Sequence, residues 1–236
     1  MSNLIHQLNY GSRVIEYHLT FTNRKTLGIR VLPDGTVHAI APIKAEDIDI
    51  QEKIKSKANW ILKQQRFFES YKPSTPARKY VNGETHLYLG KQYKLNIEKS
   101  EAKEVKIRRN EMIVLLPKPN PIAAQKIIGE WYKLKAGIVF KQSLDRVLPL
   151  FDSYTIETPY LEIRQMEKRW GSCSKSGKIT LNTALIKAPK GCIDYVVIHE
   201  LCHLVYHNHT KNFYNLLYKL CPDWEKLKQK LEQTLA

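Results

Sequence analysis

The chain has 236 residues, of which 43% are hydrophobic, and it carries a formal net charge of +15 at pH 7. This length allows one large domain or two small ones, and the hydrophobic content is enough for a sizeable core. No apolar run approaches the ~20 residues that span a bilayer, and the polar N-terminus from Ser2 to Gln7 does not resemble a secretory signal. Composition therefore argues against a membrane protein, and we expect a cytoplasmic one.

The first third of the chain predicts strands and one helix. Asp34-Gly35 separates the apolar runs 27–32 and 36–40, which is a strong signal for a β-hairpin. A single helix is predicted to begin near Asp47 or Asp49, because apolar residues then recur at helical spacing. Its expected buried face consists of Ile50, Ile54, Ala58, Ile61, Leu62 and Phe68.

Residues 72–76, Lys-Pro-Ser-Thr-Pro, are the best candidate for an exposed linker because their composition breaks a helix. Short strands are predicted between residues 79 and 95, and two more at 105–108 and 112–116. The order strand, turn, strand, helix thus occurs twice, although no sequence repeat is convincing. We group residues 1–118 as a β-rich N-terminal region with one helix.

A long helix is predicted to begin at Asn120-Pro121, with Asn as the N-cap and Pro in the first turn. Three strand candidates follow at residues 155–157, 160–166 and 178–185, and a turn at 175–177 joins the last two. An exposed edge among these strands would hold an extended peptide by strand addition, whereas the alternative interpretation is plain scaffold. The expected core face of the long helix consists of Ala124, Ile127, Trp131, Leu134 and Ile138.

The sequence His199-Glu200-Leu201-Cys202-His203 lies inside an apolar run. On a helix, positions four apart share a face, so His199 and His203 aim at one point and suit two nitrogen ligands of a metal. Glu200 projects beside them, close enough to handle a metal-bound water. Zinc fits imidazole ligands with an open catalytic position. The predicted reaction is metal-assisted hydrolysis, with a peptide bond as the first choice and another amide as an alternative.

A catalytic zinc site needs a third protein ligand, and His209 is the predicted one. Asn208 is expected to end the ligand helix because Asn tolerates the left-handed conformation. Thr210 then has the position of an N-cap for the next helix, which leaves His209 at the junction. His207 is a close rival, and Glu225 is an acidic alternative.

Several further segments, taken together with the HExxH motif, match the pattern of a known family. They are Arg169-Trp170-Gly171-Ser172-Cys173-Ser174, Gly177-Lys178-Ile179-Thr180-Leu181-Asn182, Asn208-His209, Phe213 and Pro222-Asp223-Trp224. Trp60-Ile61 and Tyr88-Leu89-Gly90 match the same pattern more loosely. In these segments the chain resembles the YgjP-like family of predicted zinc metallopeptidases. That family is similar to the SprT-like group, whose members include proteases acting on DNA-linked proteins. The resemblance implies an α+β fold with a zincin-like metallopeptidase region at 119–236, whose HExxH helix packs on a long helix and a small sheet.

The expected mechanism follows from this ligand set. His199, His203 and His209 bind one Zn²⁺ per chain, which lowers the pKa of a bound water towards ~7. Glu200 acts as general base, taking the proton and passing it to the leaving amine of a protein or peptide substrate. The sequence does not indicate the oligomeric state.

Two supporting roles stay open at this point. The candidates for the donor that stabilises the oxyanion are Tyr206, Tyr214 and Arg169, and the sequence favours none of them. The acceptors that orient the ligating imidazoles are expected at Asp223 or Glu225.

The positive charge is spread along the chain: residues 1–70 carry +3, 71–118 carry +6 and 119–236 carry +6. It predicts affinity for DNA or another acidic partner, and the alternative is a solvated lysine-rich surface. A second functional hypothesis is therefore a nucleic-acid-associated binding module with a structural zinc site. Cys173 would be its fourth ligand, although such a site has no use for Glu200. The four cysteines form no C-x-x-C pair, so we expect reduced thiols and no second zinc.

Overall fold

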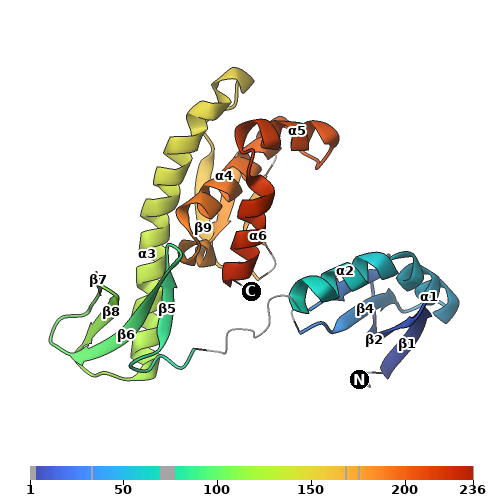
Figure 1. The fold of residues 1–236 in the computed structure, drawn as a ribbon, viewed down its shortest axis with the longest axis horizontal. Coiled ribbons are helices and arrows are strands. Elements are labelled where there is room, and N and C mark those ends of the chain that lie inside the picture. Colours follow the sequence, from blue (N-terminus) through green and yellow to red (C-terminus); the bar gives the residue numbers. More distant parts are fainter. Residues whose placement is uncertain (1–3, 33, 70–77, 168, 175, 236) are drawn as a thin grey trace. The chain divides into compact units, whose positions relative to one another are not determined.

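The computed structural model describes residues 4–32, 34–69, 78–167, 169–174 and 176–235, with only the backbone described at residues 67 and 68. The chain divides into two compact units, Met1–Pro76 and Ala77–Leu235, and each has a hydrophobic core of its own. The predicted linker, residues 72–76, lies outside the described residues. The mixed helix-and-sheet composition confirms the expected α+β class (Figure 1).

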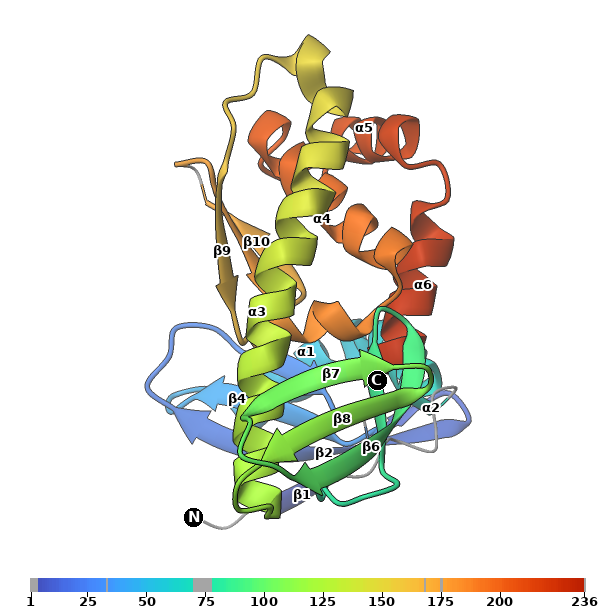
Figure 2. The ribbon, with the colours of Figure 1, turned by 90° about the vertical axis from the view of Figure 1, so that its left-hand side faces the viewer.

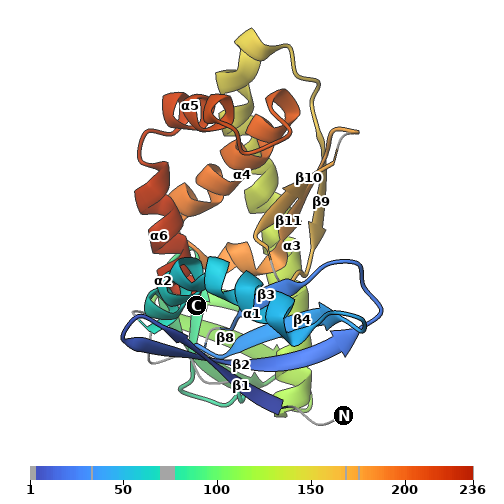
Figure 3. The same cartoon turned by 90° about the vertical axis from the view of Figure 1, so that its right-hand side faces the viewer.

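Unit 1 is a four-stranded sheet with two helices packed on it (Figure 3). The strand order is β1-β2-β4-β3, with a parallel central pair between two antiparallel hairpins. The predicted hairpin is confirmed, because β3 pairs antiparallel with β4 from Gly28↔Ile40 to Val31↔Val37. The elements are β1 (Leu4–Tyr10), β2 (Arg13–Thr22), β3 (Gly28–Val31), β4 (Val37–Pro42), α1 (Asp47–Ser56) and α2 (Ala58–Glu69).

The single helix expected after residue 47 is in fact two helices, with a break at Lys57. The Ser56 hydroxyl donates to the carbonyl oxygen of Lys53 at 2.8 Å. Such a bond competes with the helical backbone pattern and helps to end α1. The buried side chains nevertheless continue across the break, since Ile54 and Ala58 are both fully buried.

Unit 2 begins with a sheet of the same order and pairing sense, β5-β6-β8-β7. Its strands are β5 (Thr85–Tyr88), β6 (Lys91–Lys99), β7 (Glu104–Arg108) and β8 (Glu111–Leu116), as the apolar runs predicted. The first sheet of the chain and this one are therefore topological copies, each followed by helix. Figure 2 shows α3 crossing the second of them.

The chain divides after residue 76 and not after residue 118, the boundary expected from sequence. Met112 and Val114 of β8 are fully buried in the same cluster as Phe140 of α3, so the second sheet shares the core of the C-terminal half. The β5–β6 turn also fits against the start of α4. There a Cβ on Gly90, whose φ is +78°, would stand 2.7 Å from Cγ of Pro189.

Helix α3 (Pro121–Val147) is capped as predicted, because the Asn120 side chain accepts a hydrogen bond from the amide of Ala123 at 2.9 Å. Its core face differs from the expected one, since Leu134 is 63% and Ile138 47% exposed. A helix of 27 residues buries more than one stripe when neighbours lie on several sides. Its buried residues are Ala124, Ile127, Ile128, Trp131, Tyr132, Ala136, Val139, Phe140, Ser143, Leu144 and Val147.

After α3 and the 3₁₀ helix η1 (Leu148–Tyr154) comes a three-stranded sheet of order β10-β11-β9. Its strands are β9 (Tyr160–Arg164), β10 (Gly171–Cys173) and β11 (Lys178–Asn182). The strand expected at 155–157 is absent from the described structure, because Thr155 ends η1 in a left-handed conformation. Strand β10 was not predicted; three residues are too few to show an alternating pattern.

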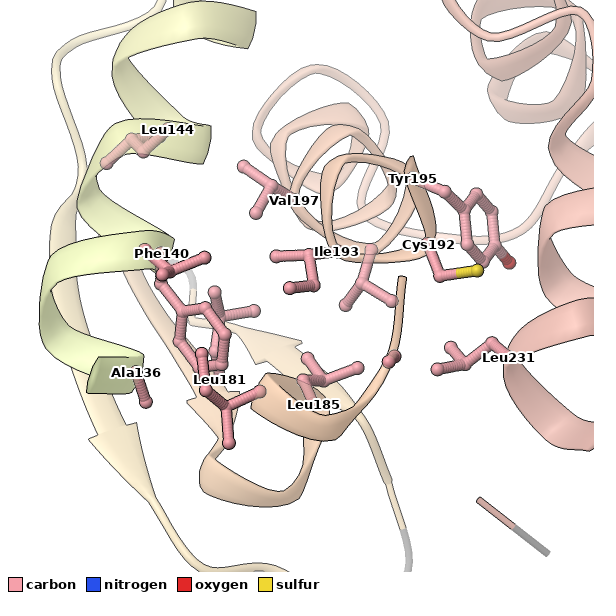
Figure 4. Close-up of a cluster of buried hydrophobic side chains, with 14 of the residues drawn as sticks. Ala136, Phe140, Leu144, Leu181, Leu185, Cys192, Ile193, Tyr195, Val197 and Leu231 are labelled. Carbon is pink, nitrogen blue, oxygen red and sulfur yellow. The ribbon is translucent and has the colours of Figure 1, made fainter. Parts of the chain in front are cut away.

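The remaining elements are η2 (Thr183–Lys187), α4 (Lys190–Val205), α5 (Lys211–Leu220) and α6 (Trp224–Leu235). Figure 4 shows α4 between α3 and α6, with Val197 and Ile193 facing Leu144 and Phe140 while Tyr195 points towards α6. The ligand helix is thus packed on the long helix, as expected. In the described part of the chain, no helix has the length and apolar character needed to cross a membrane.

Candidate metal centre

Helix α4 carries the HExxH residues and ends at Val205, three residues before the predicted stop. Tyr206 is the C-cap, with an extended conformation (φ −129°, ψ 103°), so Asn208 does not end the helix. Helix α5 begins directly after Thr210 as predicted, although the Thr210 side chain makes no capping bond. The short connection turns the chain back towards α4, and α5 lies beside its C-terminal end (Figure 1).

This turn brings His209 to the two histidines of α4. One nitrogen from each of His199, His203 and His209 lies within 4.8 Å of the others. The Nε2 atoms of His199 and His209 are 3.1 Å apart. Among the described residues, this is the group of side chains that could hold a metal, and it contains neither a cysteine nor a carboxylate.

Hydrogen bonds distinguish His203 from its neighbour His207. Nδ1 of His203 lies 3.3 Å from the carbonyl oxygen of Tyr206, a contact in which the ring donates. The proton on Nδ1 leaves Nε2 with its lone pair free. Nδ1 of His207 instead lies 3.0 Å from the carbonyl oxygen of His203, and His207 is exposed. The rival third ligand is therefore turned onto the backbone, outside the cluster.

The ring of Phe213 in α5 packs against all three imidazoles. Its ring centroid lies 5.0 Å from that of His199, 4.6 Å from that of His203 and 4.7 Å from that of His209. Phe213 is fully buried, so it holds the rings in one place and excludes water beneath them. In the sequence Phe213 stands out only as part of the family pattern, and its position four residues after His209 was the available signal.

Glu200 is 5% exposed and lies against strand β10. A Cβ on Gly171 would stand 2.6 Å from its Oε1 atom, so this strand approaches the carboxylate as closely as a glycine allows. Burial raises the pKa of Glu200 to about 7, and the nearby charge of Arg169 only partly offsets this. The strand beside Glu200 is thus β10, which is not one of the three strands predicted from the sequence.

Asn182 holds the segment that leads into β10. Its Nδ2 atom donates to the carbonyl oxygens of Met166 at 2.7 Å and Arg169 at 3.0 Å. Its Oδ1 atom accepts from the amide of Ala184 at 3.0 Å and so caps η2. The two motif segments around Gly171 and Asn182 are therefore one structural unit, which fixes the backbone next to Glu200.

Metal ligation requires unprotonated imidazole nitrogens, and burial favours this form at His199 and His203. Burial, together with the neighbouring His203 and His209, lowers the pKa of His199 to about 3. Burial and then His209 also lower the pKa of His203. At neutral pH His199 and His203 therefore offer unprotonated nitrogens.

The remaining candidate residues from the sequence lie outside the cluster of His199, His203 and His209 or contact other groups. Cys173 is in β10, outside the ligand cluster, so the four-ligand structural site is not formed. Asp223 pairs with Lys226 at 2.9 Å on the surface, and Glu225 is exposed at the start of α6. The acceptor described for an imidazole is the carbonyl of Tyr206 instead. Tyr214 packs against the His209 ring at a centroid distance of 6.0 Å.

Three imidazoles around one point, with a buried carboxyl on the same helix, define a metal-dependent hydrolase. The model of the YgjP-like family, a metallopeptidase domain, matches residues 25–234. The chain therefore belongs to the YgjP-like metallopeptidase family and is a metal-dependent peptidase.

Two solved structures are similar to part of this chain. The metallopeptidase zymogen abylysin of Pyrococcus abyssi is 22% identical with a TM-score of 0.36, and the match covers 39% of this chain and 90% of that chain. The metallopeptidase zymogen jannalysin of Methanocaldococcus jannaschii is 23% identical with a TM-score of 0.37, covering 41% and 90%. No curated protein matches this chain.

Proposed function

We propose that this peptidase is a zinc enzyme in which His199, His203 and His209 hold one Zn²⁺ per chain. The observation that carries the proposal is the convergence of the three imidazoles, with 3.1 Å between two of the Nε2 atoms. Two nitrogens bound to one tetrahedral zinc at ~2.0–2.1 Å would be about 3.3–3.4 Å apart, so the donor set fits after a shift of a few tenths of an ångström. Three protein ligands leave the fourth position open, as catalytic sites require.

Glu200 is the proposed general base. Bound zinc supplies Lewis acidity, which lowers the pKa of a water towards ~7 and polarises the scissile carbonyl. The Glu200 carboxylate accepts the proton of that water and returns it to the leaving amine nitrogen. Burial of Glu200 raises the pKa of its carboxyl, which makes it a stronger proton acceptor than an exposed glutamate.

The proposed substrate is an extended segment of a protein. Strand β10 is at an edge of its sheet, since β11 is its only neighbour among the described strands. It also lies next to Glu200. An edge strand binds an extended backbone by main-chain hydrogen bonds with little choice of side chain. An unstructured protein is therefore the first assay substrate.

The test combines metal analysis with Glu200→Gln. Wild-type protein should contain about one zinc per chain, and the variant should fold and keep that zinc, because Glu200 is not a ligand in this assignment. Cleavage of an unstructured protein should fall by roughly 10²–10⁴-fold, the usual contribution of a positioned acid–base group. Equal activity in both proteins would remove Glu200 from the mechanism, and wild-type protein without zinc would refute the metal assignment.

A further inference from the structure

Unit 2 contains a pocket of about 220 Å³ that includes none of the residues assigned above. It lies between strand β5, helix α3 and the 3₁₀ helix η2. Since one water occupies about 30 Å³ of liquid, the pocket has room for a small molecule or one substituent group. Two cations line it: Arg78, which precedes β5, and Lys187, the last residue of η2.

Lys187 is held inside this pocket rather than extended into solvent. Its Nζ atom lies over the ring of Tyr132, 5.4 Å from the centroid. The Tyr132 ring is itself fixed, because its hydroxyl donates to the carbonyl oxygen of Leu87 at 2.6 Å. Burial lowers the pKa of Lys187, and the like charge of Arg78 lowers it further. The two cations are thus close enough to repel each other.

The described part of the chain places no acidic side chain in the pocket lining. None of the lining residues is acidic, and neither Arg78 nor Lys187 has a carboxylate within 4.0 Å among the described residues. The preceding residues 70–77 contain no Asp or Glu, so they offer no side-chain carboxylate either.

The nearby Glu84 is engaged elsewhere. Its carboxylate accepts hydrogen bonds from the amides of Lys79 at 2.8 Å and Tyr80 at 2.9 Å. It also lies 3.1 Å from Nε2 of the buried His86. These bonds fix the loop that carries Arg78 without contributing a carboxylate to the pocket lining.

We propose that this pocket binds a small oxyanion, a phosphate group, between Arg78 and Lys187. Two partly buried cations without a counterion favour a ligand with about two negative charges, and phosphate carries ≈ −1.5 to −2 at neutral pH. Thr183 and Gln165 line the same pocket and supply neutral donors for the remaining oxygens. The ligand is free phosphate or a compound that places one phosphate group in the pocket, since the volume has room for one such group.

The test measures binding of inorganic phosphate to the full-length, metal-loaded protein by isothermal titration calorimetry. Lys187→Gln and Arg78→Gln should each weaken binding by about tenfold or more, because each removes one charged hydrogen-bond donor. A parallel titration with succinate distinguishes phosphate from dicarboxylate as the preferred oxyanion. If succinate binds tighter than phosphate, the assignment of a phosphate group is wrong.

Lys135→Gln is the matched control. The Nζ atom of Lys135 lies over the ring of Trp131, 5.8 Å from its centroid. This contact resembles that of Lys187 with Tyr132, and both rings belong to α3, but Lys135 does not line this pocket. Its removal should leave phosphate binding unchanged. Absence of phosphate binding to wild-type protein would overturn the proposal. Unchanged binding in folded Lys187→Gln and Arg78→Gln would do the same, because it would place the phosphate at the metal or elsewhere.

Discussion

The third imidazole of the proposed centre comes from outside the helix that carries the other two. His209 reaches the cluster because α4 ends at Val205 and the chain reverses before α5. His207 lies only two residues earlier, yet its ring bonds to the carbonyl of His203. Two histidines separated by one residue, Asn208, therefore have different predicted roles.

Changing His209→Ala should weaken zinc binding by more than about 100-fold, because it removes a ligand. Loss of a residue that only hydrogen-bonds a ligand costs roughly 10–100-fold in metal affinity. Changing His207→Ala should leave zinc binding nearly unchanged, because only an exposed backbone contact is lost. Competition with a zinc chelator at neutral pH measures both. If the His207 variant loses zinc and the His209 variant keeps it, the assignment of the third ligand is wrong.

Gly171 is the second residue on which the site depends, and the reason is space. Its φ is not in the left-handed region, but a Cβ would stand 2.6 Å from Oε1 and 2.8 Å from Cγ of Glu200. Gly171→Ala should displace the carboxylate and lower kcat/KM by roughly ten- to a hundredfold. Zinc content should not change, because the histidines are untouched.

Gly137→Ala is the control for this substitution. A Cβ there would meet only Cδ1 of Ile163 at 3.8 Å, an ordinary contact, so activity should be retained. Full activity in Gly171→Ala would show that Glu200 has more freedom than its burial indicates.

At the scale of elements, α4 is oriented by a polar contact to α3 as well as by its apolar face. Asp194 of α4 accepts hydrogen bonds from the Ser143 hydroxyl at 2.5 Å and from Nη2 of Arg146 at 2.6 Å. Ser143 is fully buried, whereas the Arg146 side chain is half exposed. The buried hydroxyl therefore makes the larger contribution, since water screens the arginine.

Asp194→Ala should lower the free energy of unfolding by about 1–3 kcal/mol, because it leaves the Ser143 hydroxyl buried without its partner. Asp145→Ala on α3 is the matched control. It breaks an exposed pair with Lys141 and should change stability by no more than about 0.5 kcal/mol. Urea denaturation of both variants measures the difference, and equal effects would mean that the contact between helices contributes nothing specific.

At the scale of the whole molecule, the same strand order occurs in both units. Each sheet has two hairpins joined by a parallel central pair, β2 with β4 and β6 with β8. The first copy packs on α1 and α2, whereas the second shares its core with α3. All the residues of the proposed metal centre belong to unit 2.

A fragment of residues 77–236 should therefore fold alone and bind about one zinc, because the core of unit 2 contains no described residue of unit 1. A fragment beginning at residue 119 should not fold, since it lacks Leu95, Met112, Val114 and Leu116 of that core. Thermal unfolding with zinc analysis compares the two. A folded fragment from residue 119 would restore the boundary expected from sequence.

The net positive charge is also a property of the whole molecule. Unit 2 carries 27 basic and 16 acidic residues, a net +11. Binding to DNA or another acidic partner stays a prediction from this charge, and binding that weakens steeply with salt would support it.

The sequence by itself determined the features that depend on local spacing. Each of these features depends on residues that lie close together in the sequence. They are the two histidines of HExxH, the position of His209 before α5, the Asn120 cap and the Asp34-Gly35 hairpin. Helical periodicity and turn chemistry act over that range, so no knowledge of distant segments was needed.

Only the tertiary structure decided which distant faces meet. Gly171 packs against Glu200, which is 29 residues later in the chain, because β10 packs on α4. Phe213 packs against His199, which is 14 residues earlier, because α5 packs on α4. The exposure of Leu134 and the place of the second sheet in the C-terminal core have the same origin. An apolar side chain is recognisable from sequence, but whether a neighbour covers it depends on packing between elements far apart in the chain.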